Sequence, residues 1–282
     1  MFGSFSNSWR LVKASFSVLR ADKELMVFPI VSTVASFIVM ISFAIPMAVV
    51  GSFNRAADGN LGILEYGVAF LFYMTMSFVV IFANSALIGA AMIRLRGGDP
   101  TLADGFRIAR EHLPHILGYA AISATVGVIL RLLQERGGTL GDILAWIGNL
   151  AWGVATYLVV PVLVVEGLGP IDAIQRSANL LKRTWGEQIV GNMSMGFIFF
   201  LITIAALFVV GVPLVMLAIA TSSILVVVLA IGVAILMIAA ISLVSSALNG
   251  IYVAAVYAYT TEGVVNEQFF QREIVEGAFR HK

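Results

Sequence analysis

The feature that most constrains this chain is a series of long apolar segments that are almost free of charge. An α-helix crosses a hydrocarbon core about 30 Å thick with about 20 residues. Four such segments, the third of them short, are Phe28–Val50, Tyr66–Ile93, Ile116–Leu133 and Ile143–Val165. A fifth uncharged stretch, from 189 to 261, is long enough for two crossings, and we place its turn near 218–223. The sequence therefore predicts six membrane spans.

The overall composition supports membrane residence and excludes several kinds of chemistry. Hydrophobic residues make up 60% of the 282 positions and charged residues only 12%, against about 25% charged in a typical soluble domain. The absence of cysteine excludes disulfides, iron–sulfur clusters, thiol catalysis and cysteine zinc sites. A net charge of +1 gives no sign of nucleic-acid binding. The first apolar segment is too long for a cleavable signal peptide, so we expect a retained span.

The distribution of basic residues predicts the orientation of the spans. With six crossings, 14 of the 17 Lys and Arg residues fall on the side that holds both termini, leaving Arg55, Arg131 and Arg136 opposite. Loops rich in Lys and Arg stay in the cytoplasm. We therefore expect an all-α polytopic protein of the cell membrane, built as three helical hairpins with both termini cytoplasmic.

A cytoplasmic amphipathic helix is predicted before each hairpin, because apolar residues recur there at spacings of three and four. We expect each apolar face to enter the headgroup boundary by about 5–10 Å. The order suggests repeat-like units at about 1–96, 97–166 and 167–262 within one domain, 1–282, followed by a cytoplasmic tail helix, 263–282. The three faces are Phe2, Phe5, Trp9, Val12, Phe16 and Leu19; Leu102, Phe106, Ala109 and Leu113; and Ile171, Ile174, Ala178, Leu181 and Trp185.

Two stretches carry a family resemblance. "SWRLVKASFSVLRADKELMVFPIVS" (Ser8–Ser32) resembles the opening of an uncharacterised prokaryotic family of integral membrane proteins of unknown function. "PVLVVEGLGPIDAIQRSANLLKRTWG" (Pro161–Gly186) is similar, more distantly, to the membrane domains attached to some glycerophosphodiester phosphodiesterases and their stand-alone relatives. The resemblance implies a six-helix membrane fold with both termini inside. It implies no activity, because the phosphodiesterase chemistry belongs to a separate soluble barrel.

Polar residues inside the spans and basic residues beside them are the candidate functional positions. The intramembrane set either lines a polar path or joins helices through hydrogen bonds of about 0.6 kcal/mol each. The basic set is expected to contact lipid headgroups at about 1 kcal/mol per residue. The first set is Asn84, Ser85, Asn149, Asn192, Ser246 and Asn249, and the second is Arg10, Lys13, Arg107, Arg110, Arg176, Lys182 and Arg183.

Nothing in the sequence predicts an enzyme, a metal or a cofactor. The span interiors hold no carboxylate or histidine of the kind that proton-coupled carriers need, and Arg131 and Glu166 lie at span ends, where snorkelling explains them. His112 and His115 share a turn interrupted by Pro114, without a third histidine nearby.

We therefore expect a non-enzymatic structural or accessory protein that organises lipids or partner proteins at the cytoplasmic leaflet. The bilayer itself, anionic lipids, a membrane-protein partner or a homo-oligomer are the expected partners. The alternative is a channel or facilitator for a small solute or lipid, without proton coupling.

Overall fold

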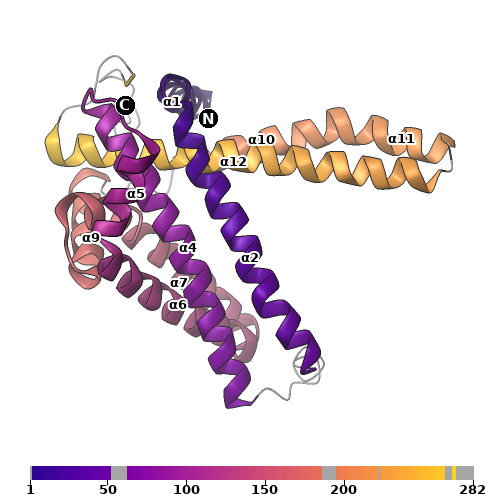
Figure 1. The fold of residues 1–282 in the computed structure, drawn as a ribbon, viewed down its shortest axis with the longest axis horizontal. Coiled ribbons are helices and arrows are strands. Elements are labelled where there is room, and N and C mark those ends of the chain that lie inside the picture. The colour runs from indigo at the N-terminus through magenta and orange to yellow at the C-terminus, as the bar shows by residue number, and fades with distance from the viewer. Residues whose placement is uncertain (1, 52–61, 186–194, 222, 264–268, 271–282) are drawn as a thin grey trace.

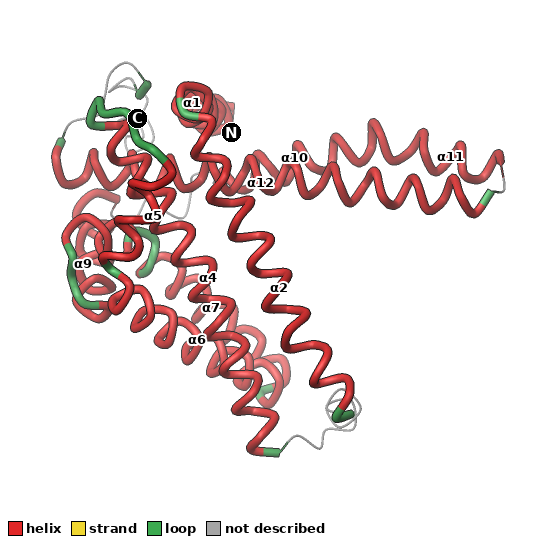
Figure 2. Tube along the Cα trace, in the orientation of Figure 1, coloured by secondary structure: helices red, strands yellow, loops and turns green. Residues whose placement is uncertain are grey.

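The computed structural model describes residues 2–51, 62–185, 195–221, 223–263 and 269–270, and within these ranges it is helical, with no strand. Six helical segments are long and apolar enough to cross a membrane. Figure 2 shows the helices, with further helical segments in two of the connections between the candidate spans. The six candidate spans are Lys23–Val49, Ile63–Leu95, Leu113–Glu135, Gly138–Glu166, Ile198–Thr221 and Ile224–Glu262.

The spans follow one another as the apolar segments predict, including the last turn. The fifth stretch divides between α11 (Val212–Thr221) and α12 (Ile224–Glu262), inside the predicted turn region. The first span consists of η1 (Lys23–Met26) and α2 (Val27–Val49), the second is α4 (Ile63–Leu95), and the third is α6 (Leu113–Arg136). In the fourth span, α7 (Gly138–Ala155) is continued by α8 (Val159–Pro161) and η2 (Val162–Glu166). In the fifth, α10 (Met195–Ala206) and η4 (Leu207–Gly211) lead into α11.

The three amphipathic helices exist and gather at one end of the molecule. They are α1 (Phe2–Ala21), α5 (Leu102–Glu111) and α9 (Pro170–Trp185). In Figure 1 the α2–α4 and α6–α7 hairpins leave this end together, whereas the hairpin of α10, α11 and α12 leaves it in a different direction. We call this end the junction, defined by α1, α5, α9 and the adjoining ends of α4 and α12. The opposite ends of the hairpins diverge.

Besides the 3₁₀ turn η1 that begins the first span, two spans depart from regular α-helix along their length. The fourth breaks at residues 156–158 and ends as the π-helix η2, and the fifth turns into the π-helix η4 just before Pro213. Proline removes the backbone donor that would bond to the carbonyl four residues earlier, which explains the distortion beside Pro213. Irregular backbone at membrane depth is tolerated only where protein or water satisfies it. The break in the fourth span is therefore a place to look for function.

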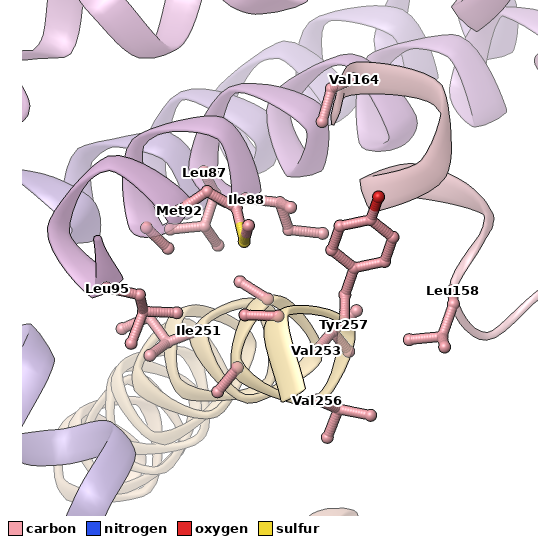
Figure 3. Packing of buried hydrophobic residues seen from close by; sticks show 14 of the residues in the cluster. Leu87, Ile88, Met92, Leu95, Leu158, Val164, Ile251, Val253, Val256 and Tyr257 are labelled. Atoms are coloured by element: carbon pink, nitrogen blue, oxygen red, sulfur yellow. The ribbon is translucent and has the colours of Figure 1, made fainter. Parts of the chain in front are cut away.

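The core of the molecule lies where the second halves of α4 and α12 cross. Leu87 of α4 and Ile251 of α12 are fully buried, and Figure 3 shows them facing one another across the crossing. A Cβ on Gly250 would lie 2.4 Å from Cδ2 of Leu87, so the glycine permits this close approach. By contrast, the most apolar window of α12 has 0% of its residues buried. That surface requires an apolar surrounding, which a bilayer provides.

Part of the apolar face of each amphipathic helix packs against the spans. In α1, Val12 and Leu19 of the predicted apolar face are buried, whereas Trp9 and Phe16 of the same face are 39% and 50% exposed. The protein therefore covers one side of this face and leaves its aromatic residues exposed. That the exposed part enters the lipid boundary stays a prediction.

The predicted face of α9 is also covered only in part. Leu181 of that face is buried together with Ala173 and Ser177, whereas Ile171, which we assigned to the same face, is 63% exposed. In α5 the predicted face is correct in position, with Ala109 buried and Phe106 5.1 Å from the Phe28 ring centroid. This face of α5 also packs against the spans. The predicted tail helix lies outside the described residues apart from Phe269 and Phe270, of which Phe270 is buried.

Candidate functional site

An ion-pair cluster fixes the N-terminal part of the junction. Asp22, between α1 and η1, is only 7% exposed, and its carboxylate accepts hydrogen bonds from Nε and Nη2 of Arg94 at the end of α4. Arg94 also pairs with Asp99 in the loop that follows. Glu24 accepts the backbone N–H of Leu102 at 3.1 Å, at the first turn of α5. These contacts hold α1, α4 and α5 in one arrangement.

A second cluster surrounds the end of the fourth span. The Glu166 carboxylate accepts hydrogen bonds from Nε of Arg176, at 3.1 and 3.0 Å to its two oxygens, and from the Tyr257 hydroxyl at 3.0 Å. Figure 3 shows the Tyr257 ring rising from α12 toward the turn that carries Val164. The π-helix η2 ends at Glu166, and Gly167 follows with φ +64. Three elements, η2, α9 and α12, therefore meet at one carboxylate.

The broken backbone of the fourth span is satisfied by the same amphipathic helix. The N–H of Leu158 donates to Oγ of Ser177 at 3.0 Å, and Ser177 is fully buried. Because Ser177 follows Arg176 directly, α9 holds the segment from Leu158 to Glu166 at both of its ends. We call the four side chains Glu166, Arg176, Ser177 and Tyr257 the α9 clasp.

The exposed face of α5 carries its own charge pairs. Thr101 caps the helix, and its hydroxyl and backbone N–H both donate to Asp104. The Thr101 hydroxyl, and then the Arg107 guanidinium, lower the pKa of Asp104 to about 2. Arg107 lies between Asp104 and Glu111, at 3.0 and 3.4 Å. The positive charge of Arg107 is therefore largely matched within its own helix.

The structure does not bring the predicted intramembrane polar residues together as one lined passage within the described chain. Ser85 is fully buried with an Oγ that has no hydrogen-bond partner, and Asn84 beside it is half-buried on α4. Asn249 and Ser246 are exposed on α12. The amide of Asn149 donates to the Ala145 carbonyl of its own helix at 2.8 Å. Asn192 lies outside the described residues.

The predicted headgroup-contacting residues divide into two groups. Arg107 and Arg176 are engaged in ion pairs with their own chain. Exposed cations form the other group, and within the described residues they have no ion pair: Arg10, Lys13, Arg110 and Lys182. Lys13 Nζ lies 5.8 Å from the Trp9 ring centroid. The side chain of Arg183 lies outside the described part of the structure.

Two of the titratable residues named from the sequence outside these sets have hydrogen-bond partners, whereas Nδ1 of His115 is buried and has none among the described residues. The Arg131 guanidinium binds Glu135 and the Tyr73 hydroxyl, so it is held by protein groups as well as by its place at a span end. His112 contacts the Ile108 carbonyl through Nδ1 at 2.9 Å. Among the described residues no group of three or more histidine, aspartate or glutamate side chains is arranged to hold a metal ion.

Sequence reasoning missed the residues that build both clusters. In the sequence, Asp22 and Glu24 were noticed only as part of the stretch that carries the N-terminal resemblance. Glu166 was noticed only as a residue at the end of a span. Tyr257 and Ser177 look like ordinary polar residues of a helix face. One signal was available: acidic residues at the ends of apolar segments are costly near lipid, so a basic partner close in the fold was to be expected.

The fold and its clusters define an all-α protein with six candidate membrane-spanning helices, which indicates a multi-pass membrane protein. The chain belongs to DUF6159, a family of unknown function, whose model matches residues 63–267. The match includes both clusters except Asp22 and Glu24. No curated protein matches the sequence.

The prediction of a family of unknown function is thus confirmed, although the match leaves out the N-terminal stretch Ser8–Ser32 that carried the resemblance. The more distant likeness to phosphodiesterase-associated membrane domains stays a prediction.

Proposed function

We propose that this protein is a non-enzymatic organiser of the cytoplasmic leaflet, which uses the junction as a rigid basic platform for anionic phospholipids. The observation that carries the proposal is the collection of α1, α5 and α9 at one end, each packed against the spans and each with exposed basic residues. Helices that only lay in the membrane interface would not need ion pairs to hold them against the spans.

The exposed cations supply the recognition. Arg10, Lys13, Arg110 and Lys182 are distributed over all three amphipathic helices, and no acidic side chain within the described residues pairs with them. Trp9 and Phe16 add exposed aromatic surface beside Lys13 and Arg20 on α1. An aromatic and basic surface of this kind fits the headgroup region of an anionic leaflet. Both termini lie on the cytoplasmic side in this proposal.

Replacement of the four exposed cations Arg10, Lys13, Arg110 and Lys182 by glutamine should lower phosphatidylglycerol retention about tenfold or more. Each cation near an anionic surface contributes about 1 kcal/mol. The measurement is native mass spectrometry of protein from maltoside micelles supplied with equal amounts of phosphatidylglycerol and phosphatidylcholine. Arg131→Gln, at the far end of α6, is the control and should retain lipid like the wild type. Unchanged retention in the four-site variant would argue against the platform.

A facilitator is the second candidate, and the break in the fourth span at residues 156–158 favours it. Interrupted helices form substrate sites in many transporters. The two candidates differ in a direct way: a facilitator passes a solute into sealed liposomes that contain the purified protein, and the flux changes in Asn84→Leu or Asn249→Leu. The organiser passes none.

A further inference from the structure

Arg176 is the one member of the α9 clasp that combines exposure with unused donors. Its side chain is 40% exposed, and the hydrogen bonds to Glu166 use Nε alone. Within the described residues neither Nη group makes a hydrogen bond. The planar guanidinium can bind one oxyanion through Nε and a second through its two Nη groups, which is the geometry that phosphate groups favour. The free edge of Arg176 is therefore an anion-binding edge.

The position of this edge is fixed from both sides. Glu166 is itself held by the hydroxyl of the buried Tyr257, and the backbone at Arg176 is held because Ser177 is buried against the broken fourth span. A free arginine loses rotamer entropy when it is ordered. Most of that cost is already met here, so a ligand gains more from each hydrogen bond.

The ligand follows from the location and the chemistry. α9 begins four residues after the last residue of the fourth candidate span. This is the level at which phospholipid phosphates lie if the span crosses the bilayer. We propose that Arg176 binds the phosphodiester group of a membrane phospholipid through its two Nη groups, with Glu166 and Tyr257 as positioning residues. The inference rests on the proposed function, which places the junction at the leaflet, and adds the residue that holds the phosphate.

If only the charge of Arg176 mattered, a variant that keeps the charge would bind lipid as the wild type does. The proposed geometry predicts weaker binding, so conservative variants distinguish the two explanations. Arg176→Lys keeps the charge, but an ammonium cannot hold Glu166 and a phosphate in one plane. Tyr257→Phe changes no charge and removes only the hydroxyl that positions Glu166. Arg131→Lys at the far end of α6 is the matched control, because Arg131 also pairs with a carboxylate of its own chain, that of Glu135.

The experiment titrates short-chain dioctanoyl phosphatidylglycerol into the full chain in maltoside micelles and follows binding by native mass spectrometry. We expect Kd to rise about tenfold in Arg176→Lys and about threefold in Tyr257→Phe, and to stay within about twofold in Arg131→Lys. Thermal midpoints in lipid-free micelles show that each variant is folded. Inorganic phosphate, titrated in the same way, should neither bind comparably nor displace the lipid.

Unchanged affinity in Arg176→Lys and Tyr257→Phe would overturn the inference, as would binding of inorganic phosphate without binding of the lipid. The inference and the proposed function fail separately. If the four-site glutamine variant loses lipid while Arg176→Lys does not, the platform stands and the Arg176 site falls. If the wild type binds no phosphatidylglycerol at all, both fall.

Discussion

Replacing Arg94 by methionine should lower the free energy of unfolding by about 3 kcal/mol, because the Asp22 carboxylate would remain buried without its partner. The Asp22 side chain is 9% exposed and that of Arg94 20%, and breaking a buried pair from one side typically costs about 3–5 kcal/mol. Because the Arg94 guanidinium is partly exposed, we expect a loss at the lower end of this range. The loss is measured by SDS titration in maltoside micelles.

Arg96→Met is the matched control on the same helix. Arg96 pairs with Glu262 between α4 and α12, but the two side chains are 50% and 36% exposed. Exposed pairs contribute about 0–1 kcal/mol. Equal losses in the two variants would show that the Asp22 cluster does not stabilise the junction as a buried pair does.

Gly105→Ala should destabilise the protein by about 2–3 kcal/mol and loosen α5 from the junction. A Cβ at this position would lie 2.5 Å from Cζ of Phe28 and 2.8 Å from the Ala86 carbonyl oxygen. The phenyl ring is 1% exposed, and the backbone oxygen belongs to α4, so neither can move away easily. Overpacking of a filled core commonly costs about 1–3 kcal/mol. Hydrogen exchange of the α5 amides should quicken together with the loss in stability.

Gly67→Ala provides the control for Gly105→Ala. Gly67 lies in α4, and a Cβ there would meet nothing within 4 Å. Alanine in an open helical position should stabilise by about 0.5–1 kcal/mol. A Gly105→Ala protein as stable as Gly67→Ala would contradict the packing of α5 on Phe28.

Much of the architecture could be predicted from the sequence because hydrophobic length is a strong signal. A bilayer sets the length of a span, so Phe28–Val50 and the other apolar stretches locate the helices to within a few residues. Turns follow from the same pattern, as at Ser223 between α11 and α12. The repeat-like units remain a prediction. Glycines with positive φ follow the second, fourth and sixth spans, at Gly97, Gly167 and Gly263, but Gly51 after the first span and Gly138 at the start of the fourth share this conformation, so it does not distinguish the repeats.

The buried side of α5 could be predicted, but those of α1 and α9 could be predicted only in part. Helical spacing shows that apolar residues share a face, but it does not tell whether protein or lipid covers that face. In α9 the covered side contains Ser177, a polar residue, because the broken fourth span offers it the N–H of Leu158. The α9 clasp depends on contacts between residues up to 91 positions apart, as in Tyr257 and Glu166. No local pattern reports such contacts.

The central claim is that the junction faces the cytoplasm while the turns of the hairpins lie across the membrane, and cysteine labelling tests it directly. The natural chain has no cysteine, so a single cysteine can be introduced without background. Arg110→Cys marks α5 at the junction, and Thr139→Cys marks the exposed first turn of α7, next to the turn from α6. With a membrane-impermeant maleimide on intact cells, we expect Thr139→Cys to be labelled, and Arg110→Cys only after permeabilisation. Labelling of both positions, or of Arg110→Cys alone, in intact cells would contradict the account.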